Sequence, residues 1–206
     1  MTSSYPRPRA AFAAVAVVAA WSAWQPYDQA TWWLEALPAV VGLPLVWLLW
    51  PRFPWTGLAA WAMALHAMIL LLGAHYTYAL TPVGFWLQEL FDFSRNHYDR
   101  IGHLAQGFFP ALLAREVLSR KTPLRGGWLA FLATCFCLAF SALYELIEWW
   151  TALALGAGAD AFLATQGDPW DTQWDMFLAL CGAVLAQLTL TPAHNRQLAA
   201  LRAARY

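Results

Sequence analysis

Charged residues are scarce in this chain. Asp, Glu, Lys and Arg make up 12% of its 206 residues, whereas hydrophobic residues make up 61%. Soluble domains carry about 25% charged residues, so the composition excludes a soluble protein and predicts an integral membrane protein. The net charge is zero, which gives no sign of a nucleic-acid partner. No segment has the composition of a soluble domain or a long linker, and we therefore expect one transmembrane domain over residues 1–206.

Cysteine and known catalytic motifs are also scarce. The three cysteines, Cys135, Cys137 and Cys181, all lie in apolar runs, and their odd number argues against a disulfide framework. The pair Cys135 and Cys137 also lacks the usual zinc-site spacing. The chain contains no Gly-x-Ser-x-Gly, His-Glu-x-x-His, P-loop or Asp-x-x-Asp-Gly motif. Any chemistry must therefore come from residues outside these signatures.

What the chain has instead is a series of apolar segments that match the thickness of a membrane. A transmembrane helix needs about 20 residues, and flanking tryptophans extend the shorter segments into the interface. Six such segments lie near residues 10–24, 36–50, 55–74, 101–118, 127–148 and 174–191. We predict an all-α integral membrane protein, a bundle of about six transmembrane helices.

The basic residues predict the orientation of this bundle. Nine of the twelve Lys and Arg residues fall on one side of the predicted spans: Arg7, Arg9, Arg52, Arg120, Lys121, Arg125, Arg196, Arg202 and Arg205. Because cytoplasmic loops are enriched in Lys and Arg, this side is predicted to be cytoplasmic. Both termini would then be cytoplasmic, with residues 192–206 as a basic tail that is either solvated or an amphipathic helix. In a bacterial inner membrane the opposite side faces the periplasm.

Six polar side chains lie at the mouths or within the exterior half of three spans. They form three pairs at helical spacing: Asp99 with His103, Glu145 with Glu148, and Asp171 with Asp175. Spacings of three and four residues place each pair on one helix face, with a depth difference of roughly 4.5–6 Å. The spans' directions then predict two layers. The mouth layer is Asp99, Glu148 and Asp171, and the deep layer is His103, Glu145 and Asp175.

Charge at membrane depth is expensive and usually serves a function. The only basic side chains on the exterior side are Arg95 and Arg100, which leaves most of the five acids without a counter-charge. A divalent cation would supply it, and carboxylates with one imidazole suit Mg²⁺, Mn²⁺, Zn²⁺ or iron.

These considerations give each polar residue a predicted role. The candidate metal ligands are His103, Glu145 and Asp175. The candidate catalytic residues are Asp99, Glu148 and Asp171, with Asp99 or Glu148 as the general base. The candidate substrate-binding residues are Arg95 and Arg100, one of which would receive an anionic group, and His97 at the pocket mouth.

Structural roles for the same residues remain open. Asp168 followed by Pro169 has the pattern of a helix start, and Thr172 with Asp175 resembles a capping box. An acid such as Asp99 also favours a helix N-terminus, and Glu148 can be solvated at the interface. Capping does not explain the deeper His103 and Glu145, for which the alternative is an interhelical hydrogen bond.

Three stretches carry a family resemblance: RNHYDRIGHLAQGFFPALLARE, SALYELIEWW and ATQGDPWDTQWDMFLALCGA. They resemble the YjdF-like family of bacterial inner-membrane proteins over roughly residues 25–192, most specifically over 95–182. This resemblance implies a multi-span inner-membrane protein of unknown function. A looser similarity is to VanZ-like membrane proteins, whose pattern is Asp-Lys-x-x-His, Glu-x-x-Gln and Asp-x-x-x-Asn. This chain differs from that pattern at Arg100, Glu148 and Asp175, so its site is more anionic.

Three functions fit these observations. The first is a metal-dependent hydrolase or transferase that acts on an envelope lipid or a lipid-linked substrate, since the pocket opens at headgroup level. The second is a proton- or ion-coupled small transporter, although the polar groups gather on one side and no inverted repeat is visible. The third is a non-catalytic membrane factor in envelope maintenance or antibiotic tolerance. The expected partners are membrane lipids and no nucleic acid.

Overall fold

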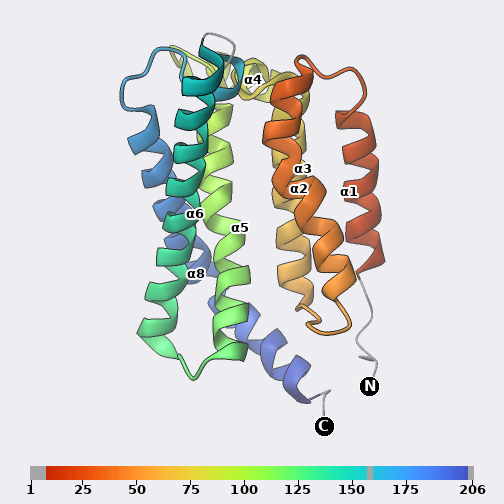
Figure 1. The fold of residues 1–206 in the computed structure, drawn as a ribbon. Coiled ribbons are helices and arrows are strands. Elements are labelled where there is room, and N and C mark those ends of the chain that lie inside the picture. The colour runs from red at the N-terminus through yellow and green to blue at the C-terminus, as the bar shows by residue number, and fades with distance from the viewer. Residues whose placement is uncertain (1–7, 157–159, 204–206) are drawn as a thin grey trace.

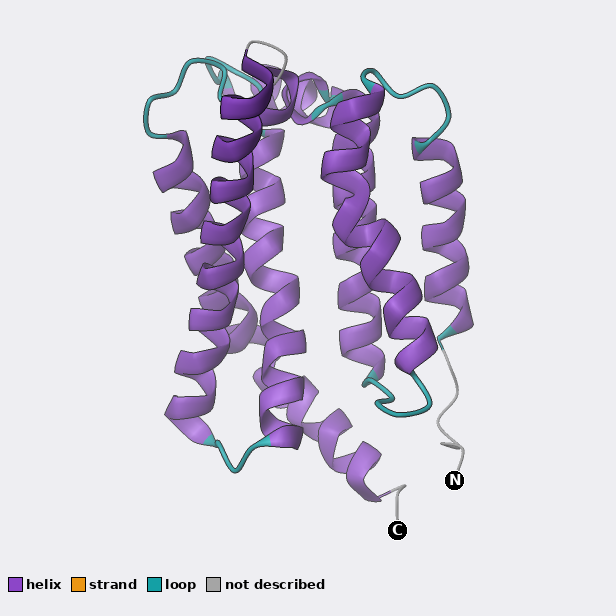
Figure 2. Cartoon of the chain, viewed as in Figure 1, coloured by secondary structure: helices purple, strands orange, loops and turns teal. Residues whose placement is uncertain are grey.

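The computed structural model describes residues 8–156 and 160–203, and within these residues it is all helical (Figure 2). The elements are α1 (Arg9–Ser22), α2 (Gln29–Leu49), α3 (Gly57–Tyr76), η1 (Tyr78–Leu80), α4 (Pro82–Phe91), α5 (Tyr98–Lys121), α6 (Gly126–Leu155), α7 (Asp160–Leu163) and α8 (Asp171–Ala203). The long helices run up and down the bundle, and the start of α1 and the end of α8 lie at the same end of it, which is called the end of the termini below (Figure 1).

The six predicted spans coincide with six helices of the structure: α1, α2, α3, α5, α6 and α8. In the described residues, four of these are long and apolar enough to cross a membrane, namely α2, α3, α6 and α8. Helix α1 has only 14 residues, and α5 carries six charged residues along its 24. The predicted helical class is confirmed, and the crossing of the membrane by all six helices stays a prediction.

Side-chain caps fix the starts of α2 and α3. Helix α2 begins at Gln29, well before the predicted residue 36, because the Asp28 carboxylate accepts a hydrogen bond from the Thr31 backbone N–H at 2.7 Å. This hydrogen bond holds the pKa of Asp28 below its usual value. The earlier start adds Glu35 to the helix, which matters for the site described below.

Two further segments lie outside the predicted spans and contain helix. The segment between the predicted spans 55–74 and 101–118 contains η1 and α4, and α4 has Pro82 in its first turn and lies across the end of the bundle opposite the start of α1 (Figure 1). The predicted tail begins as helix, because α8 continues through Pro192 to Ala203 and buries His194 and Leu198. Residues 204–206 lie outside the described residues.

The helices form two groups. In the first, α1 and α2 pack on α3 around a core of small and apolar side chains that includes Val15, Trp32 and Leu71. In the second, α5 packs closely against α8, and α6 packs against both. Helix α3 also contacts α5 and thereby joins the groups, whereas a cavity separates residues 35–42 of α2 from α5 and α6.

Candidate functional site

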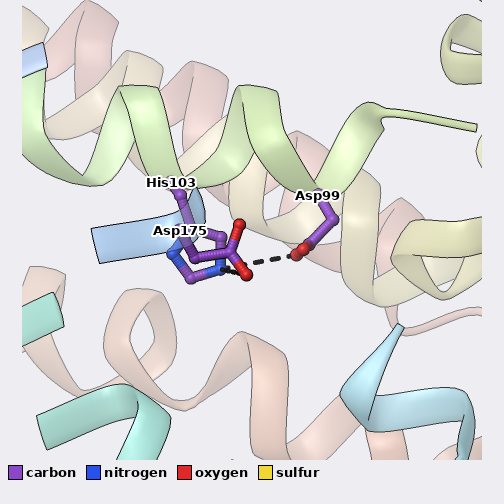
Figure 3. Close-up of side chains that lie close together, drawn as sticks. All are labelled: Asp99, His103 and Asp175. Atoms are coloured by element: carbon purple, nitrogen blue, oxygen red, sulfur yellow. Dashed lines mark ion pairs between the residues drawn. The ribbon is translucent and has the colours of Figure 1, made fainter. Parts of the chain in front are cut away.

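The three polar pairs converge at the end of the bundle opposite the termini. His103 Nε2 lies 3.5 Å from Asp99 Oδ1 and 3.9 Å from Asp175 Oδ2 (Figure 3). Its other ring nitrogen, Nδ1, is 3.9 Å from Glu145 Oε1. Helices α5, α6 and α8 thus bring carboxylates to both sides of one imidazole, as the helical spacing predicted.

The imidazole divides the acids into two groups. Asp99, His103 and Asp175 each offer a ligand atom within 4.8 Å of the others, and so do His103, Glu145 and Glu148. The set predicted from depth, His103, Glu145 and Asp175, is therefore split between the two ring nitrogens. Since one nitrogen binds one metal ion, these geometries define two candidate ligand sets that share His103, and each set includes one mouth-layer acid.

Several atoms of the site are buried and lack a hydrogen-bond partner. These atoms are His103 Nδ1, Glu145 Oε1 and Asp175 Oδ1, on side chains that are 7%, 6% and 2% exposed. Burying a polar group without a partner costs free energy, and more than nine in ten such groups in proteins are paired. Unpaired atoms beside both ring nitrogens of one imidazole indicate places for a ligand.

A close crossing of α5 and α8 holds the site together. A Cβ atom added at Gly107 would collide with the Ala179 carbonyl, and one added at Gly182 would collide with the backbone of Leu104 and Phe108. The helices therefore touch through their backbones, a form of packing that small residues permit in membranes. The crossing lies four residues beyond His103 along α5 and sets the position of α8, including Asp175, relative to it.

The two exterior arginines are engaged at the rim. Arg95 Nη2 lies 3.0 Å from Asp168 Oδ2 and 3.1 Å from Asp171 Oδ1, and Arg95 also donates to the Thr165 carbonyl. Arg100 Nη2 lies 2.7 Å from Asp168 Oδ2. These ion pairs fasten the segment 164–170, which precedes α8, to the start of α5.

This pairing changes the charge balance at the site. Two arginines meet Asp168 and Asp171, so neither cation faces the acids around His103. Among the described residues, the His103 imidazole is therefore the nearest basic group to four acids, namely Glu145, Asp175, Asp99 and Glu148. The imbalance predicted from the sequence is concentrated on these four acids.

The structure adds Glu35, which the sequence analysis did not single out. Glu35 is 3% exposed, and neither of its carboxylate oxygens has a hydrogen-bond partner. It lines the same cavity as Asp99, His103 and Glu148, but from α2, on the opposite wall. No charged residue lies three or four positions from Glu35 in the chain, so no spacing pattern could have marked it.

That cavity has a volume of about 730 Å³ and lies between α2 and α3 on one side and α5 and α6 on the other. Acids, His103 and Tyr144 line one end. Beyond His66 and Gln106 the lining becomes apolar, and the far end is formed by side chains such as Trp55 and Leu118. Across the polar end, Tyr144 of α6 donates a hydrogen bond to the Leu34 carbonyl of α2 at 3.1 Å.

Local hydrogen bonds near the helix starts account for polar residues at the rim of the site, but not for the acids around His103. Asn96 precedes the N-cap residue His97 of α5, and its Oδ1 accepts from the Tyr98 backbone N–H at 3.0 Å. Asp168 accepts from the Trp170 N–H at 3.0 Å, but α8 begins at Asp171, so the predicted helix start at Asp168 and Pro169 is a turn before the helix. Burial and the nearby Arg100 and Arg95 lower the pKa of His97, which favours its neutral form at the rim.

Glu145 also takes part in a contact between helices, which was the alternative role considered for it. Thr172 of α8 hydrogen-bonds to Glu145 of α6, which is the kind of contact expected if Glu145 only held helices together. Its Oε1 atom nevertheless remains without a partner. Glu145 therefore both links two helices and presents a free oxygen to His103.

A second buried cluster lies at the other end of the bundle and was not predicted. Glu116 Oε1 accepts from Arg120 Nη1 at 2.7 Å and from the Thr56 N–H at 3.0 Å, while Oε2 accepts from Thr56 Oγ1 at 2.7 Å and lies 3.0 Å from His194 Nε2. Arg115 Nη1 is 3.3 Å from His194 Nδ1. Because arginine only donates, Nδ1 accepts and Nε2 carries the hydrogen that Glu116 receives.

Comparisons with known proteins agree with the family suggested by the sequence. A model of the family described as "Predicted membrane protein (DUF2238)" matches residues 7–196. This chain belongs to that family. It is 51% identical over 173 residues to the inner membrane protein YjdF of Escherichia coli (strain K12), which covers 84% of this chain and 83% of the relative. No solved structure matches the chain.

Family membership establishes the class of the protein. The chain is an inner-membrane protein with transmembrane helices, as the apolar segments and the resemblance predicted. The roles of the individual site residues and the similarity to VanZ-like proteins stay predictions.

Proposed function

We propose that this protein is a divalent-metal-dependent hydrolase or transferase that acts on an envelope lipid or a lipid-linked substrate. One observation carries the proposal: buried, unpartnered ligand atoms surround His103 at the polar end of a mostly apolar cavity. Such a cavity suits an amphiphile, because its acidic end accepts a polar group and its apolar end accepts a hydrocarbon chain.

The metal would be held by His103 with Asp99 and Asp175 or by His103 with Glu145 and Glu148. When bound, a divalent cation polarises a phosphoryl or carbonyl oxygen and lowers the pKa of a water molecule. In hydrolysis the water oxygen forms the new bond, the ester bond to the leaving group breaks, and a carboxylate accepts the water's proton. We assign this base to a mouth acid of the ligand set that the metal does not use, Glu148 or Asp99.

The remaining predicted residues take roles at the rim. Arg100 Nε is buried and has no hydrogen-bond partner, so Arg100 would receive an anionic group of the substrate. Arg95 and Asp171, which pair with each other, would hold the segment 164–170 over the site. His97 would line the entrance.

The orientation follows from the basic residues. Lys121 and Arg125 lie at the end of the bundle that carries both chain ends, together with Arg120. By the excess of Lys and Arg in cytoplasmic loops, we propose that this end is cytoplasmic, that all six long helices cross the inner membrane, and that the site faces the periplasm.

Metal content of the detergent-purified protein tests the proposal. We expect about one equivalent or more of a transition metal or Mg²⁺ in the wild type, and about tenfold lower metal affinity in Glu145→Gln and His103→Ala. His66→Ala is the matched control, because His66 is another cavity histidine without neighbouring acids in the candidate ligand sets. Equal metal content in all of these variants would overturn the proposal.

The two alternatives make different predictions. A proton- or ion-coupled transporter needs polar groups along its whole path, and flux in proteoliposomes would identify it; the cavity lining beyond Gln106, which includes Leu113 and Val117, is apolar. For a non-catalytic membrane factor, Asp99→Asn, Glu145→Gln and Asp175→Asn would all leave the cellular phenotype intact.

A further inference from the structure

The cavity is much longer than the site at its polar end. Along α5 its lining runs from Asp99 to Leu118, a distance of about 28 Å at the rise of an α-helix. The hydrocarbon core of a bilayer is about 30 Å thick. A lipid chain that stays within one leaflet would occupy only about half of this length, so the cavity is built for a longer ligand or for one that passes the midplane.

The length of the cavity also bears on lipids with two chains. The acyl chains of a membrane phospholipid each reach through one leaflet, about half of the hydrocarbon core. Placed in this cavity of about 730 Å³, they would leave its far half unfilled. The cavity therefore fits one long chain better than two short ones.

The lining is graded in polarity along this length. Glu35 and His103 face the polar end, His66 and Gln106 lie further along, and side chains such as Leu113 and Phe136 complete the far part. A chain placed here would have its polar group at the buried, unpartnered acids and its tail against apolar side chains. This direction is fixed, because the reverse would bury the polar group among apolar side chains.

We propose that the cavity binds the single hydrocarbon chain of a lipid whose tail is longer than one leaflet, such as an isoprenoid phosphate carrier, in preference to two-chain phospholipids. The inference narrows the substrate class of the proposed function, on which it rests for the reaction at the headgroup. The chain site itself depends only on the length and polarity of the cavity.

Gly42 offers a way to block the cavity in its middle. It lines the cavity from α2, seven residues beyond Glu35 or about 10 Å along the helix. A Cβ atom added at Gly42 would meet nothing within 4 Å, so Gly42→Phe fills open space without a backbone clash. Gly127→Phe is the matched control, because Gly127 of α6 is also open but does not line this cavity.

The experiment compares the binding of three phosphate lipids to the full chain in detergent, for example by native mass spectrometry. Undecaprenyl phosphate has a long single chain, geranyl phosphate a short one, and dioleoyl phosphatidic acid two chains. We expect the wild type to bind undecaprenyl phosphate at least about tenfold more tightly than either other lipid. Gly42→Phe should lose this advantage and keep its affinity for geranyl phosphate, whereas Gly127→Phe should behave as the wild type.

Equal affinity for the long and short chains, tight binding of the two-chain lipid, or an unaltered Gly42→Phe would each overturn the inference. If Gly42→Phe does not fold, Val117→Phe replaces it, since Val117 lines the far end of the cavity from α5. Metal content is measured on the same samples. A chain-length preference without metal would overturn the proposed function alone, and metal without a chain-length preference would overturn this inference alone.

Discussion

Two buried glutamates near histidines lie at opposite ends of this bundle, and their surroundings differ. Glu116 has 0% exposure, and each of its oxygens accepts hydrogen bonds from at least two groups. Glu145 is also buried, but its Oε1 atom and the facing Nδ1 of His103 have no partner. We call the cluster around Glu116 saturated, because both carboxylate oxygens have hydrogen-bond partners, and the cluster around His103 unsaturated. A saturated cluster holds helices together, whereas an unsaturated one keeps its ligand atoms available. The two ends therefore differ in function although they use the same residue types.

The largest loss of stability is expected when the saturated cluster loses its carboxylate. Glu116→Ala would leave Arg120 and His194 without their acid partner in a buried environment. Removing one partner of a buried ion pair typically costs about 3–5 kcal/mol. We expect Glu116→Ala to have a much lower melting temperature in detergent. The control is Glu89→Ala, which removes an exposed acid and should change the melting temperature little. An unaltered melting temperature for Glu116→Ala would contradict the structural role of this cluster.

The next largest effect is the gain of stability when a cation binds to the unsaturated cluster. A ligand present at 100 times its dissociation constant stabilises a folded protein by about 2.7 kcal/mol. Adding Mn²⁺ or Zn²⁺ to chelator-treated wild type should therefore raise the melting temperature, and the same addition to His103→Ala should not. The prediction fails if both proteins respond alike, because the cation would then bind elsewhere.

An intermediate effect is expected at the rim of the unsaturated cluster. Arg95→Ala removes one of the two arginines that pair with Asp168, removes the arginine that pairs with Asp171, and releases the Thr165 carbonyl. Hydrogen bonds to charged groups contribute about 1.5–3 kcal/mol each when buried, and the partial exposure of this arginine reduces that, so we expect a loss of about 1–2 kcal/mol. Faster amide exchange confined to residues 164–170 would support it, and exchange spread through α5 and α8 would not.

The smallest effect on stability is expected from neutralising the unsaturated acids. Glu145→Gln and Asp175→Asn preserve shape and remove one of several mutually repelling charges, so we expect changes below about 1 kcal/mol. Thermal unfolding of these variants alongside Glu116→Gln measures the difference between the two ends. If Glu145→Gln is as destabilising as Glu116→Gln, Glu145 is primarily a structural residue.

Helical periodicity was enough to predict the three pairs. The spacing of Asp99 and His103, and that of Asp171 and Asp175, depends only on the helix, so the convergence of α5 and α8 at one end followed from the directions of the spans. The grouping by depth did not predict how the side chains meet. Asp99 lies nearer to His103 Nε2 than Asp175 does, at 3.5 Å and 3.9 Å, because side-chain reach offsets a turn of helix.

Long-range pairing was beyond the sequence. Glu116 follows Arg115, but its partners are Arg120 one turn away, His194 on α8 and Thr56 at the start of α3. Glu35 is isolated in apolar sequence, and only the position of α2 across the cavity relates it to the other acids. In both cases the helix packing, which no local pattern encodes, determines the role of the residue.

The glycine crossing of α5 and α8 has a consequence for evolution within the family. A shift of α8 by one residue would rotate Asp175 by about 100° away from His103, and the contact between Gly107 and the Ala179 backbone permits only one alignment of the two helices. We therefore expect the glycines and the acids to be retained or lost together. Relatives that keep the acids should keep Gly107 and Gly182, and relatives in which either glycine has become large should have lost the acids as well.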